Sequence, residues 1–470
     1  MVQRLPIPAA KLLSSRVHVN PGRLRVTELY FQVPLDYTKP DATTITLFAR
    51  QVVRSDAPSF VSSPENPPPS PNRYLVYLEG GPGFGNREPH ETPLARHALS
   101  RGYQLLFLDH RGTGLSTPVG ADMLSCLGGS VPAQAEYLKL MRQDNTVRDC
   151  EAVRKCLTHG WPQNKAPWSI FGQSYGGFVS LSYLSMHPEG LSEVFLTGGL
   201  APVLRSPDEV YQSAFPRIAR RNEAYYRKYP EDIVTVRQIA AHIESMGAIA
   251  LPSGGALTVP RLLTLGISFG GHEGIDSVHN IILHLKSSLD QFGFFTRAAL
   301  TPLETNTPFD TNIIYAILHE AIYCDGPDKA SDWASQRVGE RHPSFRWLKP
   351  GTSVGDVDQP LYFSGENVFP FHFETYPELI RLKEVADQLA GFDNWPRLYD
   401  EEQLSKNTVP VYAALYLEDM YVDADFSRET ARLVNNTKVF ETNVMYHDAL
   451  RSKGDAVLEQ LFSLRDDVLD

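Results

Sequence analysis

A serine framed by two glycines is the residue in this sequence best suited to nucleophilic chemistry. The pentapeptide GQSYG at 172–176 lies between an apolar run that predicts a strand, 168–171, and residues 177–184, whose apolar positions have helical spacing. A G-x-S-x-G sequence at such a junction is typical of a strained turn that exposes the serine hydroxyl. A side chain in place of either glycine would collide with neighbouring backbone in so tight a turn. The sequence therefore predicts that Ser174 is a nucleophile.

A serine hydroxyl is a weak nucleophile at neutral pH, so it needs a histidine as general base and an acidic residue that orients the histidine. In this type of turn the acid and the histidine follow the serine along the chain in that order. We expect Asp419 and His447 to take these roles, because each follows a predicted late strand and the interval between them leaves room for a crossover helix and one strand. Glu418, Asp423 and Asp425 are competing candidates for the acid.

A glycine-rich turn offers the third element of acyl-transfer chemistry. Residues 79–83, EGGPG, directly follow a predicted strand at 74–78. Acyl transfer requires backbone N–H groups aimed at the negative charge that develops on the carbonyl oxygen. We expect the N–H groups of Tyr175 and Gly81 to form this oxyanion hole, because one follows the nucleophile and the other lies in the glycine-rich turn. Pro82 has no N–H to donate.

Strand and helix patterns alternate through most of the chain and predict an α/β fold with a mostly parallel central sheet and helices on both faces. Apolar runs predict strands at 74–78, 104–108, 168–171, 194–197 and 409–416. The apolar stripe of 146–157 predicts a helix before the strand that carries the serine.

The region after residue 200 has mostly helical periodicity and many aromatic residues, until the strand pattern returns near 409. We therefore expect three parts: residues 1–200 as the first part of the core, 201–395 as a helical lid, and 396–470 as the second part of the core. An insertion at this point of the chain would overhang the edge of the sheet where ligands bind.

The N-terminal region predicts an antiparallel hairpin. Residues 24–37 and 43–53 alternate apolar and polar side chains around a turn at 39–41, which favours a hairpin at the edge of the sheet. Residues 55–71 are crowded with proline and serine, and we expect a mobile surface loop there.

The charge and hydropathy of the chain argue against nucleic-acid partners and against membrane-spanning segments. The chain has 470 residues and a net charge of −11, from 55 acidic and 44 basic residues without a long block of one sign, which disfavours nucleic acid. The N-terminus lacks the apolar core of a secretory signal, and no apolar run is long enough to cross a membrane.

The cysteines, Cys126, Cys150, Cys156 and Cys324, are too sparse for a disulfide framework and lack zinc spacing. We therefore expect a cytoplasmic protein without a metal.

These motifs together resemble the proline iminopeptidases, or prolyl aminopeptidases, among the α/β-hydrolases. The resemblance rests on five segments that span most of the core: GGPGFG at 80–85, DHRGTGLS at 109–116, GQSYGG at 172–177, DMYVD at 419–423 and HDALR at 447–451. The chain length and the GQSYGG version are similar to the larger subgroup found in some bacteria and in fungi. Two positions depart from the family pattern: Glu79 stands where many relatives have histidine, and Ala449 where they often have glycine.

The resemblance implies a serine exopeptidase that releases an N-terminal proline from small peptides and needs no cofactor. It also implies lid carboxylates that bind the free amino terminus of the substrate. The segments 319–323, HEAIY, and 365–370, GENVFP, look similar to such sites, so we expect Glu320 and Glu366 to bind the amine. The alternative for each glutamate is an ordinary exposed side chain.

Two other functions remain open at this stage. The same serine, histidine and aspartate could serve a carboxylic-ester or small-amide hydrolase with a different lid specificity, because the triad sets the reaction class and the lid sets the substrate. A non-catalytic binding protein could retain the fold. Asp109 and Arg111 are interpreted as bracing a turn. The sequence assigns no oligomeric state.

Overall fold

The computed structural model describes residues 2–56, 73–126, 129–357 and 360–467, so most of the expected mobile loop at 55–71 lies outside the described residues. A nine-stranded sheet, in the order β1-β2-β3-β5-β4-β6-β7-β10-β11, forms the centre of the described chain. Its strands are β1 (Lys11–Asn20), β2 (Leu24–Pro34), β3 (Thr44–Arg54), β4 (Tyr74–Leu78), β5 (Gln104–Leu108), β6 (Trp168–Gln173), β7 (Leu191–Thr197), β10 (Val411–Tyr416) and β11 (Thr437–Thr442).

The sheet is parallel from β5 to β11 and antiparallel from β1 to β5. The hairpin predicted near the N-terminus is confirmed, because β2 pairs with β3 from Leu24 opposite Arg54 to Pro34 opposite Thr44. Its placement at the sheet edge was wrong, since β1 pairs along the outer side of β2. Most side chains of β1 are exposed, so this strand lacks the apolar alternation that would have revealed it.

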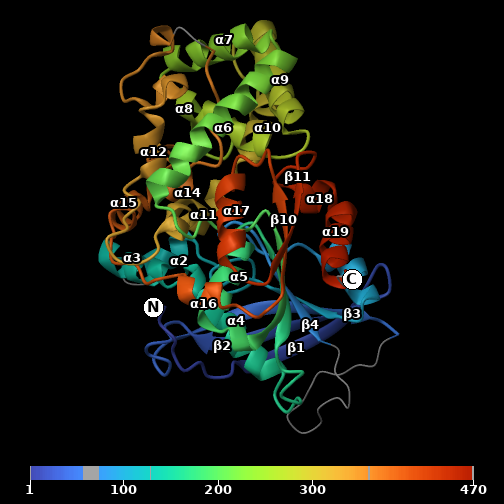
Figure 1. Ribbon diagram of the computed structural model, residues 1–470. Coiled ribbons are helices and arrows are strands. Elements are labelled where there is room, and N and C mark those ends of the chain that lie inside the picture. Colours follow the sequence, from blue (N-terminus) through green and yellow to red (C-terminus); the bar gives the residue numbers. More distant parts are fainter. Residues whose placement is uncertain (1, 57–72, 127–128, 358–359, 468–470) are drawn as a thin grey trace.

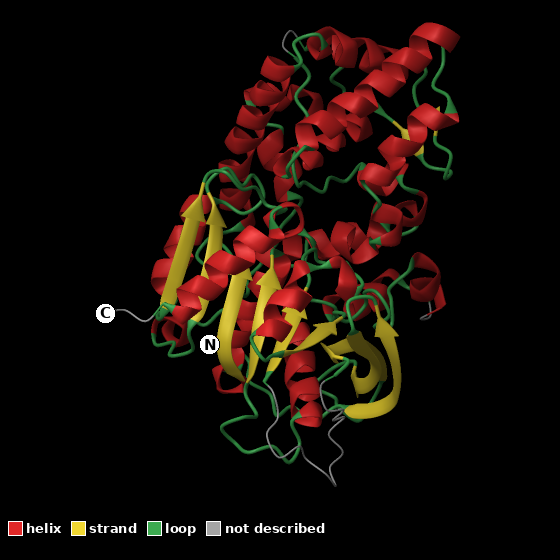
Figure 2. Ribbon diagram, turned by 90° about the vertical axis from the view of Figure 1, so that its right-hand side faces the viewer, coloured by secondary structure: helices red, strands yellow, loops and turns green. Residues whose placement is uncertain are grey.

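Helices cover both faces of the sheet, as Figures 1 and 2 show. Alternate residues of each strand point to opposite faces. Val76 and Leu106 pack in one apolar cluster with residues of α4 (Gln143–Leu157) and α5 (Tyr175–Met186). Tyr77 and Phe107 pack in another with residues of α1 (Pro93–Ser100) and α19 (Gly454–Asp466). The predicted α/β architecture is confirmed.

The chain between β7 and β10 is built mainly of helices, which stand over the ends of the parallel strands in Figure 2, at their arrowheads. Its helices are α6 (Pro207–Lys228), α7 (Asp232–Ser245), α8 (Val259–Leu263), α9 (Gly274–Phe292), α10 (Arg297–Asn306), α11 (Ile313–Leu318), α12 (Ala334–Gly339), α13 (His372–Thr375), α14 (Pro377–Ile380) and α15 (Lys383–Ala390). A short pair of strands, β8 (Ile249–Ala250) and β9 (Ala256–Leu257), joins α7 to α8.

The remaining helices belong to the core side of the molecule. They are α2 (Ala121–Cys126), α3 (Val131–Lys139), α16 (Glu401–Ser405), α17 (Ala424–Leu433) and α18 (Ala449–Ser452). Within the described residues, none of the helices combines the length and the apolar character needed to cross a membrane.

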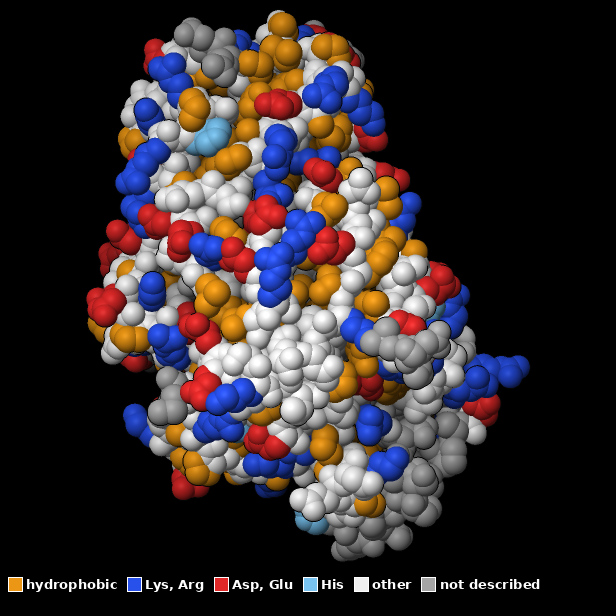
Figure 3. Space-filling model, in the orientation of Figure 1, with side chains coloured by type: hydrophobic (Ala, Val, Ile, Leu, Met, Phe, Trp, Pro, Cys, Tyr) orange, Lys and Arg blue, Asp and Glu red, His pale blue; other side chains and the backbone are white. Residues whose placement is uncertain are grey.

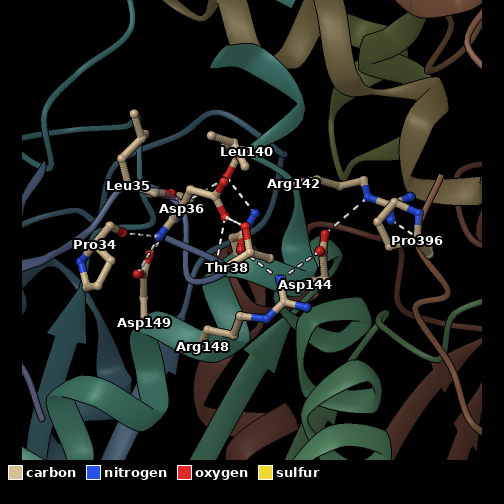
Figure 4. A network of polar contacts seen from close by, with 12 residues as sticks. Pro34, Leu35, Asp36, Thr38, Leu140, Arg142, Asp144, Arg148, Asp149 and Pro396 are labelled. Carbon is tan, nitrogen blue, oxygen red and sulfur yellow. Dashed lines mark hydrogen bonds and ion pairs between the residues drawn. The ribbon is translucent and has the colours of Figure 1, made fainter. Parts of the chain in front are cut away.

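A buried arginine ties the helical segment to the core (Figure 4). Arg142, directly before α4, donates to the carbonyl oxygen of Cys324 at 2.8 Å and to that of Pro396 at 2.6 Å. Asp144 Oδ1 lies 3.2 Å from Arg142 Nε and Asp144 Oδ2 lies 3.0 Å from Arg148 Nη1, so both buried guanidinium groups contact this one carboxylate. Burial opposes ionisation of Asp144, but the two arginines hold the pKa of its carboxyl below the usual range. The hydrogen bonds of Arg142 hold the backbone at Cys324 and Pro396 against the start of α4. Removing one charged partner of this network would leave a buried charge unpaired, which is costly.

The surface carries mixed charge on the face shown in Figure 3. Basic and acidic side chains are interspersed over the upper and lower parts of this face, and among the described residues on it neither sign forms a continuous field. This distribution fits the absence of long charge blocks in the sequence and offers no polyanion track on this face.

Candidate active site

The proposed nucleophile lies on a strained turn between β6 and α5. Ser174 has φ 53° and ψ −122°, a conformation that costs energy for a residue with a side chain. A Cβ on Gly172 would meet the backbone of Gly176, and a Cβ on Gly176 would meet the carbonyl group of Leu78. The expectation that both glycines are required by close backbone contact is confirmed.

Ser174, His447 and Asp419 form one chain of hydrogen bonds. Ser174 Oγ lies 2.8 Å from His447 Nε2, and His447 Nδ1 lies 2.7 Å from Asp419 Oδ2. Asp419 follows β10 and His447 follows β11, with α17 between the two strands. The three side chains singled out from the sequence therefore meet at one edge of the sheet.

Asp419 is held firmly where it contacts the histidine. Its Oδ1 accepts hydrogen bonds from the backbone N–H groups of Tyr421, at 2.8 Å, and Val422, at 3.1 Å. Burial alone would lower the pKa of His447, but Asp419 outweighs it and the pKa is raised above its usual value. A carboxylate in this position fixes the tautomer of the imidazole and stabilises the imidazolium ion.

The competing acids lie elsewhere. Asp423 accepts from the guanidinium of Arg217 at 2.7 Å and from the backbone N–H groups that begin α17. Glu418 is exposed. Asp425 pairs with Arg428 at 2.9 Å. Of the four candidates only Asp419 contacts His447 in the described structure.

The glycine-rich turn packs against the nucleophile. A Cβ on Gly80 would meet the side chains of Gln173 and Ser174, so the turn leaves no room for a larger residue. The N–H of Gly80 donates to Glu79 Oε1 at 2.8 Å and is therefore engaged. Gly81, with φ 128°, lines the cavity beside Ser174. Tyr175 is the first residue of α5, so its N–H has no acceptor within the helix.

A cavity of about 630 Å³ opens over these residues. The core contributes Ser174, His447 and the glycine-rich turn to its wall, and the helical segment contributes Tyr315 and Glu366. Tyr421 also lines it, with its ring 4.8 Å from the imidazole of His447 in an edge-to-face arrangement. This volume suits a small ligand.

Two carboxylates of the described helical segment line the cavity, Glu273, which is exposed, and Glu366, which is half-buried. Glu366 Oε1 accepts a hydrogen bond from the hydroxyl of Tyr315 at 2.8 Å, and within the described residues its Oε2 accepts none. Burial and the charge of Glu366 raise the pKa of Tyr315 well above its usual value, which keeps this hydroxyl protonated as a donor. One carboxylate oxygen thus remains open to a cationic group.

Glu320 lies apart from the cavity, which differs from the expectation drawn from the sequence. Its carboxylate accepts hydrogen bonds from the N–H groups of Ala334, at 3.1 Å, and Ser335, at 2.9 Å, where α12 begins. Burial raises its pKa to about 7. The carboxylate serves backbone groups that the helix leaves without partners, and it is not among the residues that line the cavity.

Tyr315 and Tyr421 are cavity residues that the sequence did not reveal. Tyr315 lies in the apolar run 313–318, where an aromatic residue is typical of core packing. Tyr421 lies two residues after Asp419, and its only signal was this proximity. Asp109 and Arg111 have the structural roles expected of them, since Asp109 accepts from the N–H groups of Asn86 and Leu115, and Arg111 pairs with buried Asp149 at 2.6 Å.

Comparisons with known proteins show which family the sequence belongs to. The family model described as alpha/beta hydrolase fold matches residues 74–253. "Proline iminopeptidase aneH" of Aspergillus aculeatus is 41% identical over 99% of this chain and 99% of its own length. "Proline iminopeptidase" of Aeromonas sobria is 38% identical over 97% of this chain and 100% of its own length. Among solved structures, an alpha/beta fold family hydrolase from Bacillus anthracis strain Sterne overlaps with a TM-score of 0.37 at 12% identity, over 96% of this chain and 99% of that chain.

Proposed function

The chain belongs to the proline iminopeptidase family of α/β-hydrolases, and on that premise we propose that it is a serine exopeptidase that releases N-terminal proline from peptides. The observation that carries the proposal is the unbroken contact from Ser174 through His447 to Asp419 beside a cavity that a lid carboxylate shares. Full-length similarity to two proline iminopeptidases supports the substrate class.

Ser174 is the nucleophile of the proposed reaction. Its hydroxyl attacks the carbonyl carbon of the N-terminal proline while His447 Nε2 takes the proton. The tetrahedral intermediate collapses when His447 returns this proton to the leaving amine, and an acyl-enzyme remains. A water molecule, activated by His447 in the same way, then releases proline and restores the serine. Asp419 keeps the imidazole in the tautomer that accepts on Nε2.

The N–H groups of Tyr175 and Gly81 form the oxyanion hole of this proposal. Both belong to backbone that is held by close packing, so the donors are oriented before the reaction begins. The engagement of the Gly80 amide by Glu79 supports the choice of Gly81 in this turn.

Glu366 binds the substrate's free amino terminus. An ammonium group pairs strongly with a carboxylate in a cavity that excludes water, and Tyr315 orients the carboxylate. We assign residues 201–395 as the lid that carries this group, residues 1–200 and 396–470 as the two parts of the core, and small peptides with a free N-terminus as the substrates. Glu320 acts at the start of α12 instead.

A cytoplasmic location completes the proposal. All four cysteines lie in the described residues and none of them is in a disulfide bond, which is usual for proteins of a reducing compartment.

A pair of substrates tests the function. Proline arylamide is expected to be hydrolysed, and N-acetylproline arylamide, which lacks the cationic amine, is expected to be hydrolysed at least about a hundredfold more slowly because its amide carries no charge for Glu366 to bind. Equal turnover would contradict amine recognition. Hydrolysis of simple carboxylic esters without turnover of proline arylamide would favour the ester hydrolase instead.

A further inference from the structure

A buried carboxylate stands directly beside the proposed oxyanion hole. Glu79 is 4% exposed and directly follows β4, at the start of the glycine-rich turn. Its Oε1 accepts from the N–H of Gly80 at 2.8 Å and from the hydroxyl of Tyr77 at 3.3 Å. Gly80 in turn lies against Ser174, so Gly80 links the carboxylate to the nucleophile.

A negative charge here opposes the chemistry. The carbonyl oxygen of the substrate becomes negative in the transition state, and a second negative charge nearby raises the energy of that state in a site with little water. The buried carboxylate of Glu79 therefore requires an electrostatic counterweight.

Arg451 is placed to supply it. Its Nη2 lies 3.6 Å from Glu79 Oε1, and both residues line the cavity. Arg451 lies in α18, four residues after His447, so the segment that carries the base also carries this cation. Burial and Glu79 raise the pKa of Tyr77, Arg451 lowers it, and Arg87, a second cation in the cavity wall, lowers it less.

We propose that Arg451 is a positioning residue that neutralises Glu79, so that Glu79 can hold the Gly80 amide and the glycine-rich turn without repelling the oxyanion. The inference rests on the proposed acyl-transfer function. Glu79 and Arg451 act as one unit: the carboxylate shapes the turn, and the guanidinium cancels its charge.

Two variants and their combination test the unit. Arg451→Leu leaves an uncompensated carboxylate and is expected to lower kcat for proline arylamide about tenfold on the alkaline plateau, with KM changed less than about twofold. Glu79→Gln keeps the amide oxygen as acceptor for Gly80 and removes only the charge. The double variant is therefore expected to recover to within about twofold of Glu79→Gln alone, a non-additive result.

Lys453→Leu is the matched control, since it removes a cation two residues away that does not line the cavity. Arg451→Lys should retain most of the activity. Arg451→Leu indistinguishable from Lys453→Leu, or a loss that persists in the double variant of an equally stable protein, would overturn the proposal. Thermal denaturation shows which variants are folded.

The pH profile separates this role from a purely structural one. His447 is faced by Asp419 and Glu366, which raise its pKa, by Arg451, which lowers it against the background of burial, and by the ring of Tyr421. Loss of Arg451 is expected to move the acid limb of kcat/KM to higher pH in both the single and the double variant, whereas the plateau loss belongs to the single variant alone. An unmoved limb would contradict the placement of Arg451 near the base.

The same measurements keep the inference distinct from the proposed function. If the wild type hydrolyses a 4-nitrophenyl ester but not proline arylamide, the substrate assignment fails, while the variant series on the ester still tests Arg451.

Discussion

The core side and the lid side of the cavity are built on different principles. Ser174, Asp419 and His447 follow strands β6, β10 and β11, respectively. Because these strands belong to the parallel part of the sheet, their carboxyl ends lie at the same edge. Glu366 and Tyr315 come from a segment of short helices and turns that no sheet register aligns. A residue placed after a parallel strand therefore has a position that topology dictates, whereas a lid residue depends on the packing of its own surroundings.

Two lid glutamates show what this difference means. Glu320 and Glu366 were singled out by similar reasoning, yet Glu320 accepts from two N–H groups at the start of α12 and Glu366 faces the cavity. On the core side, Glu418, Asp423 and Asp425 competed with Asp419 for the role of the acid, and the contact with His447 in the structure decides for Asp419. The lid is thus the part of the site in which specificity can change while the reaction is retained.

Replacement of the nucleophile gives the largest expected effect on the core side. Ser174→Ala is expected to lower kcat for proline arylamide by about 10⁴-fold or more, because the covalent route is lost and only binding and the oxyanion donors remain. Single-turnover assays at high enzyme concentration measure the residue of activity. Ser185→Ala, which removes a buried hydroxyl from the same helix away from the cavity, should retain activity within a few-fold. Comparable losses in the two variants would break the claim that strand-end topology defines the centre.

The aspartates on either side of Tyr421, Asp419 and Asp423, test which residue acts as the acid. Asp419→Asn is expected to lower kcat by about 10³-fold, because an amide at this position favours the wrong tautomer of His447. Asp423→Asn should instead weaken the contact with Arg217 and the start of α17, and so lower the midpoint of thermal denaturation with little effect on kcat. Steady-state kinetics and thermal denaturation of both variants separate the two outcomes. A larger kinetic loss in Asp423→Asn would assign the acid to that residue.

The core side of the site could be predicted from the sequence more completely than the lid side. Apolar runs and the chain order of Ser174, Asp419 and His447 were sufficient to predict these parallel strands and the residues at their ends, since a strand buried on both faces leaves a continuous apolar run in the sequence. Strand β1 escaped prediction because its side chains are mostly exposed. The role of Glu320 was not predicted, because the N–H groups that donate to its carboxylate lie 14 and 15 residues further along the chain. They belong to a helix that only tertiary packing brings close to Glu320.

On the lid side, Glu366→Gln has the largest expected effect. The variant keeps the shape and the contact with Tyr315 but loses the charge that pairs with the substrate ammonium, so kcat/KM for proline arylamide should fall about a hundredfold. Hydrolysis of a 4-nitrophenyl ester without an amine should change little. Tyr315→Phe, which only frees the carboxylate to rotate, should lose about three- to tenfold. Equal losses on the ester would mean that Glu366 acts on the reaction itself rather than on amine recognition.

The smallest expected kinetic effect belongs to Glu320, and it is the most direct test of the contrast within the lid. Glu320→Gln should change kcat/KM for proline arylamide by less than about twofold, because the side chain lies outside the cavity wall. Its effect should fall on stability. Burial raises the pKa of Glu320 from 4.5 to about 7, so the folded state binds this proton more tightly than the unfolded chain does. The resulting contribution to the free energy of unfolding is complete below pH 4.5 and is lost as the pH rises through about 7.

Urea denaturation of the wild type and of Glu320→Gln at pH 5 and pH 8 measures this contribution, since other titrating groups are common to both proteins and cancel in the difference. The wild type should lose more stability between the two pH values than the variant, which has no proton to release at this position. An equal change in the free energy of unfolding between the two pH values in both proteins would show that Glu320 does not titrate in this range. A hundredfold loss of kcat/KM in Glu320→Gln would remove the contrast itself, because both lid glutamates would then bind the amine and the lid would be as directly readable from its sequence as the strand ends of the core.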